Sequence, residues 1–281
     1  MDRVVELGGF VTGFHVTKHC IDCMCGRDLL KIDKRSREII YRRAVFEKEG
    51  SSRKLLADDE QIYIYDFCTL YVLDQKNYEL LGKWQLGNDL SSDICGIAVD
   101  DTAIYCSIRN GKIITLDKQS FLAKESIVSN SSMWSMGTYE QYLICGTVDG
   151  KLLLLDKSTL SIEKDIALGK KNIGSFYMDG GTIYAASHAG KLFKIGMGNF
   201  AIEASVKDAH KKMFACAGIC GDMLTTVSYP CSEIALWNKD TLKKIKVIHA
   251  PLKLSGSTHI ENNGMYICSR NIFGIDWIQL N

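Results

Sequence analysis

Hydrophobic and polar residues alternate along most of the chain in runs of five or six positions, and turn residues separate these runs. Alternation with a period of two is typical of β-strands. The segment 94–128 shows the pattern clearly and predicts four strands, at 94–99, 103–107, 112–116 and 122–128. No segment has a sustained helical period, so we expect an all-β protein.

This four-strand unit occurs seven times. The copies 103–128 and 143–168 align residue for residue through a run that ends Gly-Lys-x-x-x-Leu-Asp-Lys. With the Asp of this run as the reference, the equivalent positions are Asp33, Asp74, Asp117, Asp156, Gly196, Asn238 and Asp276. They recur every 38 to 43 residues, which is the period of a propeller blade. We therefore expect a seven-bladed β-propeller of four-stranded antiparallel blades.

The last copy is incomplete, because the chain ends at Asn281 before a fourth strand can form. Residues 3–7 precede the first complete copy and have the pattern of a strand. We expect this N-terminal strand to close the last blade, since an open sheet edge can recruit another chain. The chain contains only two prolines and no linker-like segment, so residues 1–281 are expected to form a single propeller domain.

The composition is that of a soluble protein, with 46% hydrophobic residues and a net charge of +1. No apolar run approaches the roughly 20 residues of a membrane span, and the N-terminus does not have the pattern of a signal peptide. These features favour a cytoplasmic protein without membrane contact. The eleven cysteines are scattered through apolar strand patterns, so we expect reduced, buried thiols.

The repeat resembles that of seven-bladed WD-repeat propellers, in architecture and period more than in motif. The Trp-Asp pair that ends the third strand of a WD repeat is mostly Leu-Asp or Ile-Asp here. The segment most similar to that pair is Leu236-Trp237-Asn238. The Gly-His pair found early in a WD repeat is absent. The Leu-Asp-Lys-x-x-Leu phrase is equally similar to quinoprotein-like propellers of the YVTN type. Their paired tryptophans cannot be traced among the four tryptophans of this chain. The resemblance implies the fold and leaves the activity open.

The strand order assigns each loop to one of two sides of a blade. We call the side with the turns between second and third strands, and with the connections between blades, the top side. Basic residues of these turns are Arg27, Arg109, Lys112, Lys151, Lys191 and Arg270, and those of the connections are Arg53, Lys170, Lys171, Lys207, Lys211, Lys212 and Lys253. Acidic residues dominate the turns between first and second strands on the opposite side, at Asp58, Asp59, Glu60, Asp100, Asp101, Glu140, Asp179, Asp222 and Glu261.

The top side also carries acids, at Glu47, Glu49, Asp89, Asp93, Asp149 and Asp208, so it is biased towards basic residues and not uniformly positive. Such a side with aromatic residues near it suits an acidic partner. The residues expected to bind it are Arg109, Trp134, Lys151, Lys191, Phe214, Tyr229 and Arg270. The alternative is that the basic residues are solvated turn residues and that Trp134 belongs to the core. We expect a non-catalytic scaffold, monomeric within a complex, that binds a protein or an acidic segment; nucleic acid is a second option. No cofactor is expected.

Catalytic motifs are nearly absent: the chain has no Gly-x-Ser-x-Gly, no His-Glu-x-x-His and no phosphate-binding loop. The run His19-Cys20-x-x-Cys23-x-Cys25 does not suit a metal, because residues two apart on a strand lie about 6.8 Å apart. His188 is predicted in a top-side turn. It supports the alternative function, a lyase- or cyclase-type enzyme or small-molecule binder, which would require a carboxylate partner.

Overall fold

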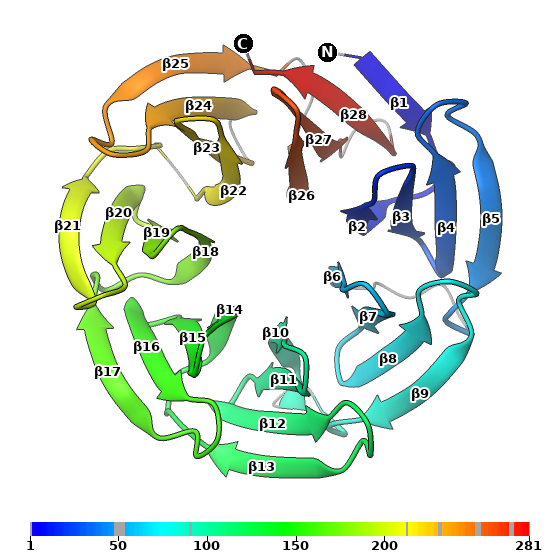
Figure 1. The fold of residues 1–281 in the computed structure, drawn as a ribbon, viewed down its shortest axis with the longest axis horizontal. Coiled ribbons are helices and arrows are strands. Elements are labelled where there is room, and N and C mark those ends of the chain that lie inside the picture. The colour runs from blue at the N-terminus through cyan, green and yellow to red at the C-terminus, as the bar shows by residue number, and fades with distance from the viewer. Residues whose placement is uncertain are drawn as a thin grey trace. The chain divides into compact units, whose positions relative to one another are not determined.

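The computed structural model describes residues 2–47, 54–89, 92–211, 213–229, 232–250, 254–269 and 273–280. In this part of the chain, 28 β-strands form seven four-stranded antiparallel sheets (Figure 1). These are the blades of a seven-bladed β-propeller, so the predicted all-β fold is confirmed.

The chain divides into two compact units, which are described separately. Unit 1 comprises residues 1–85, 217–239 and 244–281, and unit 2 comprises residues 86–216 and 240–243. We number the blades from 1 to 7 in chain order.

Unit 1 holds blades 1, 2 and 7 and nearly all of blade 6. Their strands are β2 (Val11–Val16), β3 (Cys20–Cys25), β4 (Asp28–Asp33) and β5 (Ile39–Ala44) in blade 1; β6 (Lys54–Ala57), β7 (Gln61–Tyr65), β8 (Thr69–Asp74) and β9 (Leu80–Gln85) in blade 2; β22 (Ala215–Cys220), β23 (Met223–Ser228), β24 (Glu233–Asn238) and β25 (Lys244–His249) in blade 6; and β26 (Leu254–Glu261), β27 (Gly264–Ser269), β28 (Gly274–Gln279) and β1 (Asp2–Glu6) in blade 7.

Unit 2 holds blades 3, 4 and 5. Their strands are β10 (Ile94–Val99), β11 (Ala103–Ile108), β12 (Lys112–Asp117) and β13 (Ala123–Ile127) in blade 3; β14 (Met133–Tyr139), β15 (Tyr142–Thr147), β16 (Lys151–Asp156) and β17 (Ile162–Ala167) in blade 4; and β18 (Ile173–Asp179), β19 (Thr182–Ser187), β20 (Lys191–Gly196) and β21 (Ala201–Val206) in blade 5.

Hydrophobic cores lie between neighbouring blades within each unit. In blade 4, Leu153 packs into the core shared with blade 3, and Leu154 packs into the core shared with blade 5. Both faces of the middle strands are thus covered, which explains why Leu152–Leu155 is an unbroken apolar run instead of an alternating one. Cys106 and Cys145 are 0% exposed, and burial raises the pKa of Cys106 to about 12.

The turn after the third strand has the same structure in several blades. Asp156 accepts hydrogen bonds from the backbone N–H groups of Ser158 (3.0 Å) and Thr159 (2.8 Å), and its carbonyl accepts one from Leu160 N–H (2.8 Å). Asp33, Asp74 and Asp117 accept bonds from the same relative positions. The recurring Asp is therefore explained as the acceptor that shapes this turn.

Each such turn ends with a residue of positive φ that is not glycine. These residues are Arg37, Tyr78, Phe121, Leu160, Phe200 and Leu242, with φ between 52° and 63°. A left-handed conformation costs about 1–2 kcal/mol for an L-residue. Several of the side chains offset this cost by packing on the preceding blade: the Tyr78 hydroxyl donates a hydrogen bond to Asp22 of blade 1, and Phe200 contacts Tyr142 of blade 4 edge to face.

The sequence alignment is wrong for the reference residue of blade 7. In blade 4 the reference residue Asp156 pairs with Tyr142 at the start of the second strand, and the residue that pairs in this way in blade 7 is Gln279. Asp276 instead lies inside β28, 1% exposed, where Arg3 donates a hydrogen bond of 2.7 Å to it. The pair Ile275-Asp276 resembles the Leu-Asp pair that ends the third strand in other blades, but it lies in the interior of β28 and not at its end.

The N-terminal strand β1 pairs antiparallel with β28 and is the fourth strand of blade 7, as predicted. Val4, Val5 and Leu7 are buried in the core shared with blade 1. In the residues that the structure describes, no helix is long and apolar enough to cross a membrane.

Removal of residues 1–8 should strongly destabilise the protein. Burial of a Val or Leu side chain contributes about 1.5–3 kcal/mol, so loss of Val4, Val5 and Leu7 should lower the free energy of unfolding by roughly 5 kcal/mol, and Asp276 would also lose Arg3. Urea denaturation of the full chain and the truncated chain measures this difference. Equal midpoints would contradict the role of β1.

Asp156 should make stability depend on pH in acid. Hydrogen bonds from Ser158 and from Thr159 N–H lower its pKa from 3.8 to about 2. A group whose pKa is lower in the folded state stabilises the protein above its unfolded pKa, and this contribution is lost as the pH falls through the folded pKa. Asp156→Asn keeps the acceptor oxygen and removes the charge. The difference in urea midpoint between wild type and this variant should therefore shrink as the pH falls from 4 to 2; a constant difference would contradict the assignment.

Candidate interaction surface

The top-side loops of unit 2 are hydrogen-bonded to one another. The backbone N–H of Leu168 binds the Gly150 carbonyl (2.9 Å), that of His188 binds the Asn172 carbonyl (2.8 Å), and that of Ala209 binds the Gly190 carbonyl (2.8 Å). These bonds join the turns of blades 4 and 5 to the connections that flank blade 5. The loops therefore form one continuous surface.

A β-bulge places Trp134 on this surface. The register of β14 against β15 shifts between Met133 and Ser135, so the Trp134 side chain leaves the alternation of the strand. Met133 is 0% exposed, whereas Trp134 is 42% exposed. Trp134 is thus available at the surface, and the interpretation as a core residue is wrong.

Arg109 is tied to a buried carboxylate. Its guanidinium donates a hydrogen bond of 2.8 Å to Asp93, which is 0% exposed. This hydrogen bond raises the pKa of Arg109. Arg109 therefore neutralises a buried charge of its own blade, and substitution by Glu would place a second carboxylate beside Asp93.

Lysines that begin the third strand are neutralised within blades 3 and 4. Lys112 Nζ lies 2.7 Å from Glu125, and Lys151 Nζ lies 2.6 Å from Asp165. The carboxylate of Asp165 raises the pKa of Lys151. In blade 5 the equivalent acidic position is occupied by Ser205, which pairs with Phe193 as Asp165 pairs with Leu153.

Blade 5 consequently carries an excess of positive charge at its top side. Five lysines, which we call the blade 5 lysine group, lie on the joined loops: Lys170, Lys171, Lys191, Lys207 and Lys211. Two acids oppose them on these loops, Asp149 in the turn of blade 4 and Asp208 after blade 5. Among the described residues, no lysine of the group makes an ion pair, and all but the half-buried Lys191 are exposed. The sequence showed these lysines but not that they lack acidic partners. The only signal of this lack was Ser205, which occupies the position of Asp165 and Glu125.

The other predicted contact residues lie in different environments. Phe214 is 1% exposed and packs on His210 with ring centroids 4.7 Å apart, so it supports the loop and offers no surface to a partner. Tyr229 belongs to unit 1, where it packs against the core of blades 6 and 7. Arg270, Arg53, Lys212 and Lys253 lie outside the described residues.

His188 lies in the top-side turn of blade 5, as predicted, with its ring over Gly174, where any side chain would overlap it. Burial lowers its pKa, and no charge on another described residue contributes to the shift. A general base needs a partner that orients it. The carboxylate that an enzyme would require is not found around His188 in the described part of the chain.

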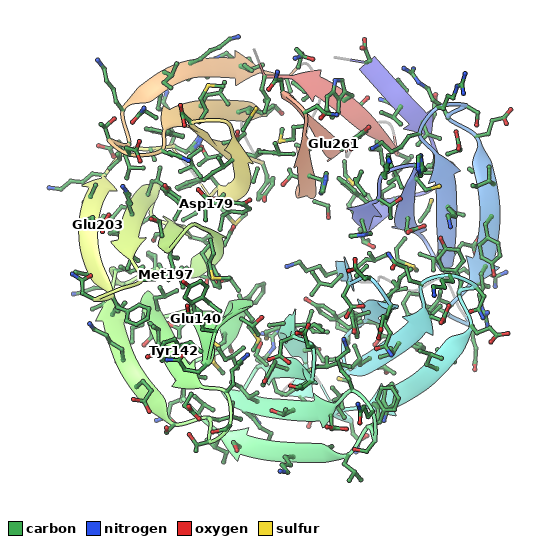
Figure 2. The ribbon with its side chains drawn as sticks, in the orientation of Figure 1. Glu140, Tyr142, Asp179, Met197, Glu203 and Glu261 are labelled. Atoms are coloured by element: carbon green, nitrogen blue, oxygen red, sulfur yellow. The ribbon has the colours of Figure 1, made fainter. Side chains whose placement is uncertain are left out.

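Acidic residues on the opposite side participate in bonds that hold the blades together. In unit 2, Lys157 of blade 4 lies 2.8 Å from Asp100 of blade 3. In unit 1, Lys34 of blade 1 lies 2.6 Å from Glu261 of blade 7, which Figure 2 labels. Both lysines directly follow the recurring Asp. The Asp-Lys pair of the repeat therefore stabilises the contact between neighbouring blades. Asp100 and Glu261 are therefore structural, whereas Asp59, Glu60, Asp101, Glu140 and Asp222 on the same side are exposed.

Metal binding has no support in the described residues, because no three His, Cys, Asp or Glu side chains among them are grouped closely enough to hold an ion.

No known protein family matches the chain, and no curated protein is significantly similar to it in sequence. Among solved structures, the crystal structure of the computationally designed Ika8 protein is similar, with a TM-score of 0.73 and 11% sequence identity over 99% of this chain and 100% of that chain. At this identity the similarity shows the fold alone. It does not distinguish the WD-repeat type from the YVTN type, and the number of blades follows from the seven sheets of this chain.

Proposed function

We propose that this protein is a non-catalytic interaction scaffold and that the blade 5 lysine group binds an acidic segment of a protein partner. The observation that carries the proposal is the contrast between top-side lysines: Lys112 and Lys151 are neutralised by their own blades, whereas the five members of the blade 5 lysine group have no ion pair among the described residues. Like charges held on joined loops raise the local potential and attract an acidic ligand.

Apolar residues near the lysines favour a protein partner. Trp134 and Val148 expose much of their side chains on blade 4, and Met213 does so after blade 5. Aromatic residues and Met are enriched in the centres of protein interfaces. Domains that bind nucleic acid are usually strongly basic, whereas this chain has a net charge of only +1. A protein segment with acidic and apolar residues fits the surface better than a polyanion does.

The frame suits a scaffold because the loops are fixed by hydrogen bonds to neighbouring strands and turns. Rigid loops lose little conformational entropy when a partner binds. In this proposal Lys191 and Trp134 are the central contacts, and Arg109 and Lys151 border them while keeping their internal ion pairs.

A charge-reversal variant tests the proposal. Lys170→Glu, Lys171→Glu and Lys191→Glu together should weaken binding of a fluorescent peptide of Glu, Asp and Leu by at least about tenfold at low salt, because the attraction becomes repulsion. Fluorescence anisotropy measures the affinity, and wild-type binding should fall as salt rises. Trp134→Ala should speed dissociation.

The matched control carries the same change of charge elsewhere, at the exposed lysines Lys18, Lys76 and Lys243. This control should bind the peptide like wild type. Equal loss in both triple variants would show a non-specific charge effect and overturn the site. Tighter binding of a single-stranded oligonucleotide than of the peptide at matched charge would overturn the proposed class of partner.

A further inference from the structure

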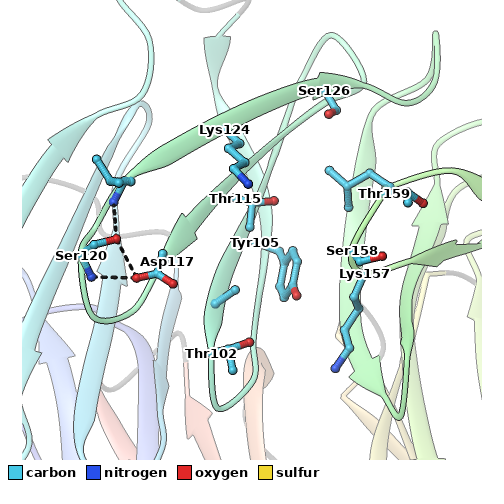
Figure 3. Close-up of a pocket in the computed structure, with 13 residues that line it drawn as sticks. Thr102, Tyr105, Thr115, Asp117, Ser120, Lys124, Ser126, Lys157, Ser158 and Thr159 are labelled. Carbon is cyan, nitrogen blue, oxygen red and sulfur yellow. Dashed lines mark hydrogen bonds between the residues drawn. The ribbon is translucent and has the colours of Figure 1, made fainter.

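A cavity of about 390 Å³ lies between blades 3 and 4, away from the blade 5 lysine group (Figure 3). One wall is the face of β11, β12 and β13, and the other is the turn after the third strand of blade 4, residues 157–160. Its volume lies within the range of small-molecule sites, about 300–1,000 Å³. All of its lining residues belong to unit 2.

The next crevice along the chain is filled, and this comparison explains why the cavity exists. Between blades 4 and 5, Tyr142 and Phe200 meet edge to face with ring centroids 5.3 Å apart (Tyr142 is labelled in Figure 2). The residues at the equivalent positions between blades 3 and 4 are Ala103 and Leu160. Two aromatic rings are thus replaced by a methyl group and an isobutyl group, which leaves the space open.

The same comparison shows that one lysine is left without a hydrogen bond. Lys164 of blade 4 pairs with Leu154 across the sheet, and its ammonium donates a hydrogen bond to the Asn199 carbonyl of blade 5. The equivalent lysine of blade 3 is Lys124, which pairs with Thr115. Among the described residues Lys124 makes no hydrogen bond or ion pair, and it lines the cavity.

Two hydroxyl groups accompany Lys124 on this face. Thr115 Oγ1 is shielded from solvent and has no hydrogen-bond partner, and Thr115 lies opposite Lys124 on the neighbouring strand (Figure 3). Ser126, two positions after Lys124 on β13, also lines the cavity and makes no hydrogen bond within the described chain. A buried hydroxyl without a partner costs about 1–3 kcal/mol. Thr115 lines the cavity, so rotation of its side chain towards a ligand oxygen would recover stability.

The remaining polar groups of the cavity are already bonded. Asp117 accepts hydrogen bonds from Gln119 N–H and from Ser120, and Lys157 is held by Asp100. Ser158 and Thr159 donate to Asp156. Among the described residues, two unpaired charges therefore face the cavity, the ammonium of Lys124 and the carboxylate of Asp117, whose pKa is lowered by its hydrogen bonds from Ser120 and by Lys124. The Asp117 carboxylate already accepts three hydrogen bonds, so the donor left to a ligand is the ammonium of Lys124.

We propose that this cavity binds a small organic anion, with a carboxylate or phosphate bonded by Lys124, Thr115 and Ser126. Leu122, Leu160 and Tyr105 line the rest of the cavity and form apolar walls for the body of the ligand. Charge-assisted hydrogen bonds from an ammonium and hydroxyl groups favour an oxyanion over a neutral oxygen. This second site is independent of the proposed scaffold function.

Phenyl phosphate serves as the probe, with inorganic phosphate and benzyl alcohol to separate the anion from the apolar body. Titration followed by ¹H–¹⁵N NMR should shift the amide signals of Thr115, Lys124, Ser126 and Leu160 when phenyl phosphate is added. Lys124→Gln should weaken its affinity by about tenfold or more, as expected for loss of a charge-assisted hydrogen bond. Sodium benzoate distinguishes carboxylate from phosphate.

Two further variants complete the test. Lys164→Gln is the matched control and should leave the affinity unchanged, because Lys164 already bonds Asn199. Ala103→Tyr with Leu160→Phe should fill the cavity as Tyr142 and Phe200 fill the next crevice, and should abolish binding while the NMR spectrum stays that of a folded protein. Benzyl alcohol binding as tightly as phenyl phosphate, or equal affinity in wild type and Lys124→Gln, would overturn the proposal.

Discussion

Each unit depends on the turn that follows the third strand of its blades, because this turn holds one blade to the one before it. The Asp carboxylate bonds two N–H groups of the turn, and the chain then takes a left-handed conformation four residues later. That residue directs its side chain at the preceding blade, as Tyr78 does at Asp22 and Phe200 at Tyr142. Burial and hydrogen bonding there offset the cost of the backbone conformation. The Lys after the Asp adds an ion pair to the same preceding blade in the two cases Lys34 and Lys157.

The same turn decides whether a crevice between blades is filled or open. A large residue at the left-handed position, facing a large residue on the preceding blade, leaves no space, as with Phe200 and Tyr142. Leu160 opposite Ala103 leaves a cavity of about 390 Å³. The frame tolerates both because the hydrogen bonds of the turn involve the Asp and the backbone, and they do not depend on the size of the side chain. A change of two side chains can therefore create a site without a change of fold.

Charged residues are likewise paired in several blades, and among the described residues the top-side lysines lack an ion pair where one blade differs from the others. On the side of the first turns, Asp100 and Glu261 are bonded to lysines of neighbouring blades, so these two acids stabilise the contacts between blades. On the top side, Lys112 and Lys151 are neutralised by Glu125 and Asp165. Blade 5 departs from this pattern because Ser205 replaces the acid. Both proposed sites thus arise where one blade departs from the pattern of its siblings.

The sequence by itself determined the number of blades, the four strands in each and the N-terminal strand of blade 7, because a strand alternates with a period of two and the Asp turn repeats about every 40 residues. It misplaced Asp276, since an Ile-Asp pair looks the same at the end of a strand and inside one. Burial and pairing were decided only by the tertiary structure. A bulge exposes Trp134, while Phe214 packs inward on His210. Arg109 meets Asp93 across 16 residues of sequence, and Lys124 makes no hydrogen bond among the described residues whereas the equivalent Lys164 bonds a carbonyl of the next blade.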